Sequence, residues 1–74
     1  MSRKSELKRA IEQSREEIEN LERKLGRSQV AIIEAIISQS KPSDKDIEYF
    51  RTYAALIDVE RENLQKLNEE YKTL

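Results

Sequence analysis

The stretch Ser40-Lys41-Pro42-Ser43-Asp44 lies near the middle of the chain and decides its fold. Pro42 cannot continue a helix that arrives from the N-terminal side, and it biases the residue before it away from helical backbone angles. Ser43 is a strong N-cap for a second helix, with Asp44 in its positive first turn and Asp46 as a capping-box partner. The stretch therefore predicts that one helix ends and another begins within a few residues.

The composition on both sides of this break favours helix. The 74 residues include one Gly and one Pro, and Glu, Lys, Arg, Leu, Ile, Ala and Gln are abundant. These residues lose little on entering a helix. We expect an all-α single domain over residues 1–74, with helix 1 from about 3 to 39, a turn at 40–43 and helix 2 from about 44 to 73. A four-residue connection suits antiparallel neighbours, so the prediction is a two-helix coiled-coil hairpin.

Both predicted helices carry apolar residues at alternating steps of four and three, which is the spacing of a coiled-coil seam. The seam positions of helix 1 are Leu7, Ile11, Ser14, Ile18, Leu21, Leu25, Ser28 and Ile32. Those of helix 2 are Ile47, Phe50, Ala54, Ile57, Arg61, Leu64, Asn68 and Tyr71. Pairing positions whose numbers sum to 82 puts small residues opposite small ones and polar opposite polar. Only Leu21 opposite Arg61 departs from this rule, and the arginine can reach water or Glu22. This register leaves the basic start of helix 1 as an overhang without a partner helix.

More apolar side chains lie near the turn than one seam can bury. They fall beside the seam at helical spacing, with Gly26 continuing their line on helix 1, where it could permit close helix approach. Burying six such side chains would contribute roughly 1.5 to 3 kcal/mol each, comparable with the whole stability of so small a domain. We therefore expect homo- or hetero-oligomerisation to complete the hairpin, through Val30, Ile33, Ile37, Tyr49, Tyr53 and Leu56.

Size and composition exclude several classes of function. A chain this short buries only about 60% of the surface that it exposes when unfolded, so a deep catalytic pocket is hard to build. It has no Cys or His, and its net charge is −1. We expect no enzymatic activity, no cofactor and no metal, and neither nucleic acid nor membrane as the main partner. The run from Val30 to Ile37 is too short to span a bilayer, and no export signal is recognisable, so a cytoplasmic location is expected.

Several features together resemble the small needle-subunit co-chaperones of bacterial type III secretion systems. These are the length, the hairpin, the tetrapeptide Ser14-Arg15-Glu16-Glu17, the proline at the turn, and the helix 2 pattern Ile47, Ala54, Ile57, Leu64, Leu67 and Tyr71. The resemblance implies that the hairpin pairs with a TPR-like chaperone, and that the two hold an aggregation-prone secretion subunit in the cytoplasm. The chain would then be a co-chaperone or adaptor that binds through the apolar residues near the turn.

Two other interpretations stay open. The first is a Rop-like homodimeric four-helix bundle with a regulatory or nucleic-acid-associated role. The second is a finger that inserts into an enzyme. Asp44, Asp46 and Glu48 make the tip acidic, and a long hairpin with an acidic tip resembles the coiled-coil finger of Gre-type transcript-cleavage factors, as does the segment from Ile32 to Tyr49. Pro42 and Lys45 stand where the tip acids of that family would fall, so cleavage activity is not inferred. Whether the three acids do more than cap helix 2 is left open.

Overall fold

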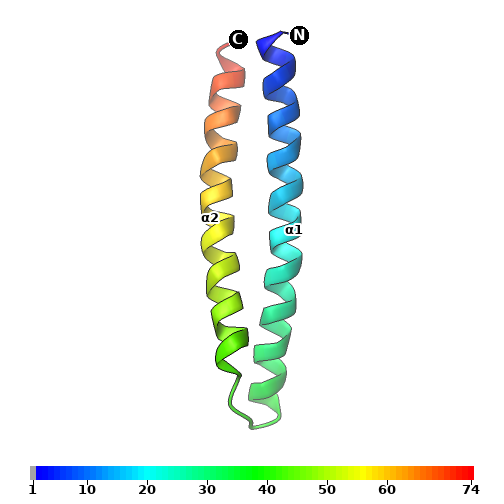
Figure 1. Cartoon of the computed structure of the whole chain (residues 1–74), viewed down its shortest axis with the longest axis vertical. Helices are drawn as coiled ribbons and strands as arrows, with labels where there is room; N and C mark the ends of the chain where they lie inside the picture. Colours follow the sequence, from blue (N-terminus) through cyan, green and yellow to red (C-terminus); the bar gives the residue numbers. More distant parts are fainter. Residues whose placement is uncertain (1) are drawn as a thin grey trace.

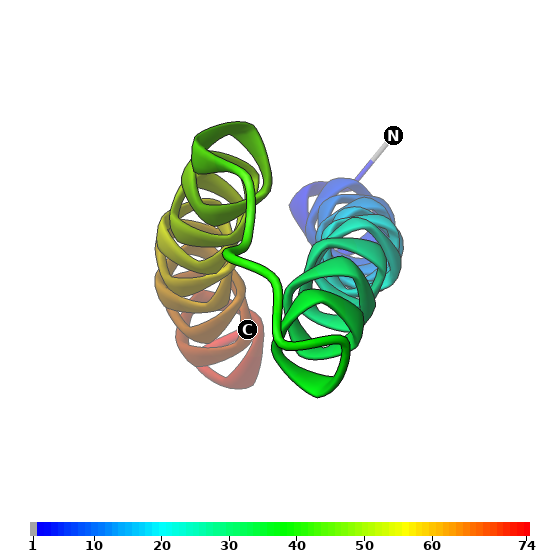
Figure 2. The same cartoon turned by 90° about the horizontal axis from the view of Figure 1, so that it is seen from below.

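The computed structural model describes residues 2–74 and shows two long antiparallel helices, which confirms the all-α hairpin (Figure 1). Helix α1 spans Arg3–Ile37 and helix α2 spans Asp44–Lys72, with residues 38–43 connecting them. The N- and C-terminal ends lie side by side, opposite the connection (Figure 1). Seen along the long axis, the helices are inclined to one another, as expected for packed helices of this kind (Figure 2).

Serine side chains cap the start of both helices. The Ser43 hydroxyl accepts a hydrogen bond from the backbone N–H of Asp46 at 3.1 Å, which confirms its predicted role. At the start of α1, Ser2 does the same for the backbone N–H of Ser5 at 3.2 Å. Each hydroxyl satisfies a backbone donor that has no partner within the helix.

The end of α1 is set by its own cap rather than by Pro42. The backbone N–H of Ser40 donates to the Ala35 carbonyl, and that of Gln39 donates to the Ile36 carbonyl. This is the Schellman pattern, which requires a left-handed residue after the C-cap. Gln39 supplies it with a φ of 59°, a conformation that favours glycine. Helix α1 therefore ends two residues before the predicted boundary, and the connection has six residues instead of four.

The predicted seam forms the interior of the hairpin. On α1, six of the eight seam positions are buried, and Leu25 and Ile32 are half-buried. On α2, Ile57 is buried and the other seam residues are half-buried, apart from Arg61, whose side chain is exposed. Residues at seam spacing therefore pack α1 against α2, as predicted.

The register of the two helices differs from the prediction by about one heptad. When two residues contact each other across the hairpin, their residue numbers add up to about 75 rather than 82. The pairs, with their sums, are Arg3 with Glu70 (73), Ser14 with Glu60 (74), Lys4 with Tyr71 (75) and Lys24 with Tyr53 (77). One long-armed ion pair, Arg61 with Glu22 at 3.5 Å, departs from this trend. Leu7 has no residue opposite it in the predicted register, yet only 1% of its surface is exposed. The predicted pairing was therefore wrong.

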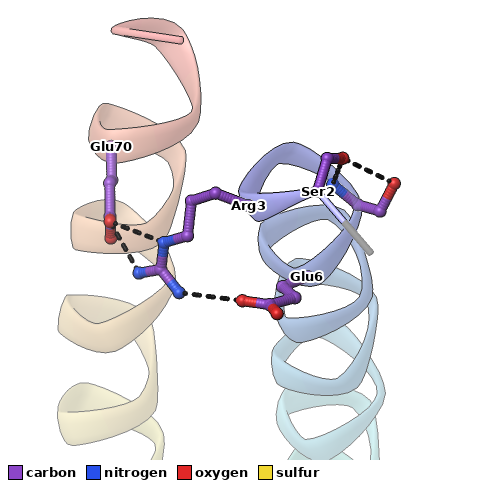
Figure 3. Close-up of polar contacts among 5 residues, drawn as sticks. Ser2, Arg3, Glu6 and Glu70 are labelled. Atoms are coloured by element: carbon purple, nitrogen blue, oxygen red, sulfur yellow. Dashed lines mark hydrogen bonds and ion pairs between the residues drawn. The ribbon is translucent and has the colours of Figure 1, made fainter.

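The start of α1 consequently has a partner, and the predicted basic overhang does not form. Arg3 Nη2 lies 2.6 Å from Glu70 Oε1 on α2, and Arg3 Nη1 lies 3.5 Å from Glu6 Oε2 (Figure 3). The hydrogen bond and the charge of Glu70 raise the pKa of the Arg3 guanidinium. The Lys4 ammonium lies 5.7 Å from the centre of the Tyr71 ring. Arg3 and Lys4, two of the basic residues of the expected overhang, thus contact the last turns of α2.

An overhang exists instead at the turn, where it is apolar. Because the numbers of paired residues add up to about 75, Asp44 at the start of α2 lies level with residue 31 of α1. Helix α1 therefore continues about six residues beyond the first residue of α2. Figure 1 shows α1 reaching farther than α2 and the connection returning from its end. The last turns of α1 therefore have no α2 residues opposite them. This explains why Ile36 and Ile37 are 61% and 75% exposed.

Replacing Gln39 by glycine should stabilise the hairpin by about 1 kcal/mol, because glycine adopts the left-handed conformation without the steric cost of a Cβ. For a chain this short that corresponds to an increase in Tm of about 4 to 8 °C. Thermal unfolding followed by circular dichroism measures the change. The matched control, Gln29→Gly inside α1, should lower stability by about 1 kcal/mol. A fall in Tm for Gln39→Gly would contradict the assigned cap.

Leu7→Ala distinguishes the two registers. In the observed register Leu7 is buried, so its truncation should lower the free energy of unfolding by about 2 to 3 kcal/mol. In the predicted register it would lie beyond the end of α2 and the change would be small. Urea unfolding measures the difference, and Val59→Ala at a position 63% exposed is the control, with an expected change within about 0.5 kcal/mol.

Candidate protein-interaction surface

The six predicted binding residues lie on the surface in two groups, one on each helix. On α1, Val30, Ile33 and Ile37 are exposed. On α2, Tyr49 and Leu56 are exposed and Tyr53 is half-buried. At 100° per residue the two groups turn away from the seam in opposite directions and so face different sides of the hairpin.

The group on α2 borders an open groove of about 280 Å³, which we call the tyrosine groove. Its lining residues are Lys24, Arg27 and Ser28 of α1 with Asp46, Tyr49 and Tyr53 of α2. The rings of Tyr49 and Tyr53 stack, with centroids 6.1 Å apart and planes inclined by 25°. They are one helical turn apart, which lets the side chains of Tyr49 and Tyr53 meet on one face. The groove therefore presents a flat aromatic wall made by α2.

Cations surround this aromatic wall. The Lys24 ammonium lies 6.0 Å from the Tyr53 ring centre, and the Lys45 ammonium lies 5.9 Å from that of Tyr49. Both distances are in the range of cation–π attraction. Lys24 and Arg27 are the two positively charged residues of the lining, and Asp46 is its one acid. The groove combines apolar surface with net positive charge, although the whole chain is slightly acidic.

The group on α1 forms a second surface, which we call the isoleucine stripe: Gly26, Val30, Ile33 and Ile37. Val30 is 54% exposed and Ile33 is 46% exposed. A Cβ built at Gly26 would meet no atom within 4 Å. Gly26 therefore does not bring α1 and α2 together, and it leaves an open position on the outer surface of α1.

Three further apolar residues are exposed but do not belong to the predicted set: Ile36, Val59 and Leu74, the last of which is 58% exposed. Ile36 is 61% exposed beside the isoleucine stripe, and Val59 is 63% exposed on α2. The exposure of Ile36 is explained by the register, because the last turns of α1 extend past the start of α2. A wheel projection could have identified Val59, because it lies on the side of α2 opposite the seam.

The acidic start of α2 shows no arrangement for metal binding. Within residues 2–74, no three acidic side chains come close enough to hold a metal ion together. Asp44 and Asp46 lie in the first turn of α2, where negative charge is favourable. A second open groove, near the ends of the chain, is lined mainly by long polar side chains: Arg61, Leu64, Gln65, Asn68, Glu69 and Lys72.

Comparison of the chain with protein-family models, with curated proteins and with solved structures finds no match. In the described chain, residues 2–74, neither helix has a stretch that is both long and apolar enough to cross a membrane. The surface geometry is therefore the main guide to function.

Proposed function

We propose that this chain is a non-enzymatic protein-interaction module that binds an amphipathic helix of another protein in the tyrosine groove. The observation that carries the proposal is the stack of the exposed Tyr49 ring on the half-buried Tyr53 ring, with a lysine over each ring. Tyrosines are favoured at interfaces because they bury a large apolar ring while the hydroxyl stays hydrogen-bonded.

The spacing of the apolar residues on α2 fits helix recognition. Tyr49, Tyr53 and Leu56 recur at i, i+4 and i+7, so they form one ridge on α2, and its two tyrosines line the groove. A second helix can lay its own apolar ridge against such a surface. Burying Leu56, which is 45% exposed, and the two rings would offset much of the cost of ordering the partner.

The charges of the groove indicate the chemistry of the partner. Lys24 and Arg27 outnumber Asp46 in the lining, and Lys45 lies against the Tyr49 ring. Acidic residues on the flanks of the bound helix would therefore be attracted and basic ones repelled. Electrostatic complementarity of this kind selects partners and accelerates their encounter. The partner is therefore a helix with an apolar ridge bordered by Glu or Asp.

A more specific form of the proposal is a cytoplasmic co-chaperone that joins a TPR-like chaperone to a secretion subunit. Its support is the sequence resemblance to type III secretion co-chaperones, together with a helical hairpin that leaves apolar residues exposed. It is tested by co-purification from the native host: a TPR-like chaperone should accompany the wild-type chain and be lost with Tyr53→Asp.

Two designed peptides test the groove directly. Each is an amphipathic helix with the same leucine ridge, flanked by Glu in one peptide and by Lys in the other. Fluorescence anisotropy of the labelled peptides should show the Glu-flanked peptide binding about tenfold more tightly at low salt. Tyr53→Asp should weaken that binding at least tenfold, because it places a carboxylate in the apolar ridge.

The control is Gln13→Asp, which adds a negative charge at an exposed position of α1 that lies about 16 Å along the helix from Lys24 and so outside the groove. It should bind both peptides as the wild type does, and circular dichroism should show equal helicity for both variants. Equal binding of the two peptides, or full binding by Tyr53→Asp, would contradict the proposal.

A further inference from the structure

The isoleucine stripe has the heptad spacing of a second packing surface. Gly26, Val30, Ile33 and Ile37 follow steps of four, three and four, as the seam does. At 100° per residue the stripe lies roughly 140° around α1 from the seam, on the side away from α2. Each of the three apolar residues in it is about half exposed or more. A further helix can therefore pack along α1 without displacing α2.

The stripe is complementary in shape to a second copy of itself that runs in the opposite direction. Consider the pairing in which the numbers of two facing residues add up to 63. Val30 then lies opposite Ile33 of the second copy, and Gly26 lies opposite Ile37 of the second copy. Ile37 is 75% exposed, whereas the position beside Gly26 is open space. The largest projection on the stripe thus meets its one gap, as a knob meets a hole.

The charges beside the stripe are also complementary in this arrangement. Arg27 follows Gly26 and Glu34 follows Ile33, so the two occupy equivalent heptad positions beside the stripe. In the antiparallel pair, Arg27 of each copy faces Glu34 of the other. Neither residue takes part in an ion pair within the described chain. Because the dimer is two-fold symmetric, this ion pair occurs twice in it.

We propose that two copies of this chain associate through their isoleucine stripes, with the two α1 helices antiparallel and Arg27 paired with Glu34 across the interface. The inference does not depend on the proposed function, because the residues of the isoleucine stripe do not line the tyrosine groove, and only the flanking Arg27 belongs to both surfaces. Ile36 closes the edge of the contact, opposite Gln29 of the second copy. Because few side chains are buried, the interface is smaller than the roughly 800 Å² per partner that is typical of stable complexes. We therefore expect weak association, with a Kd on the order of 10 μM.

Charge reversal tests the pairing. Sedimentation equilibrium of the wild-type chain should show a mass that rises from 8.7 kDa toward twice that value with concentration. Arg27→Glu and Glu34→Arg should each weaken self-association about tenfold, because each places like charges together twice. The double variant Arg27→Glu/Glu34→Arg should restore it. The two residues are seven apart, too far to interact along one helix, so the rescue must occur between copies.

The folding of these variants is expected to be intact. Arg27 lies within one turn of Arg23 and Lys24, so a glutamate there replaces repulsion by attraction and favours the helix. Helicity measured by circular dichroism should therefore stay equal or rise while self-association falls. A chain that remains monomeric at 1 mM would overturn the proposal, and so would a dimer that the charge reversals do not weaken or that the double variant does not restore.

Gly26→Leu separates hairpin stability from self-association. Leucine is a better helix former than glycine, and a Cβ at this position meets no atom of the hairpin, so Tm at low concentration should rise. In the dimer the same side chain collides with Ile37 of the second copy, and self-association should fall at least tenfold. Thr52→Leu adds a leucine to the exposed side of α2 and should leave self-association unchanged. Unchanged or stronger association of Gly26→Leu would overturn the assigned surface.

The orientation is tested with a spin label on Glu12→Cys, which is unique because the natural chain has no cysteine. In the antiparallel pair the two labels lie about 60 Å apart along the helix axis, at 1.5 Å per residue. A distance near 60 Å by electron dipolar spectroscopy is expected. A separation of about 20 Å or less would show parallel helices and overturn the antiparallel pairing.

Discussion

The contact between α2 and one stripe of α1 is the interaction on which the rest of the molecule depends. No disulfide links the two helices, because the chain has no cysteine. Helices of 35 and 29 residues gain most of their stability in a protein from packing against each other. Leu7, Ile11, Ile18 and Leu21 supply the buried apolar side chains of α1, against Ile57 of α2. The position of α2 along this stripe determines which side chains remain exposed.

The sequence predicts the faces of the helices but not their register, and the heptad repeat is the reason. A shift of seven residues returns every seam position to the same face, so Leu25 opposite Ile57 and Ile18 opposite Ile57 are equally compatible with the pattern. The registers differ in their polar partners. Ser14, 3% exposed, donates a hydrogen bond of 2.7 Å to Glu60 Oε1, and Asn63 Nδ2 donates to the same oxygen. Glu60 lies outside the predicted seam, so the apolar pattern did not reveal this contact.

The connection between the helices depends on the same choice. Pro42 and Ser43 predicted the start of α2 correctly, because a proline and a serine N-cap act locally. The end of α1 depends on Gln39 in a left-handed conformation, and glutamine carries no strong preference for it. The longer connection lets the chain return along α1 before α2 begins. The six predicted surface residues were identified by surplus alone, which needs the faces and not the register.

The two surfaces differ in composition and share one residue. The tyrosine groove is aromatic and positively charged, whereas the isoleucine stripe is aliphatic and carries both signs of charge at its edge. Arg27 lines the groove and also flanks the stripe. Under both proposals its guanidinium is attracted either to acidic residues of a bound helix or to Glu34 of a second copy. A charge shared in this way couples two binding equilibria, and the coupling acts equally on each. Self-association would then weaken the preference of the groove for acidic partners without covering its aromatic wall.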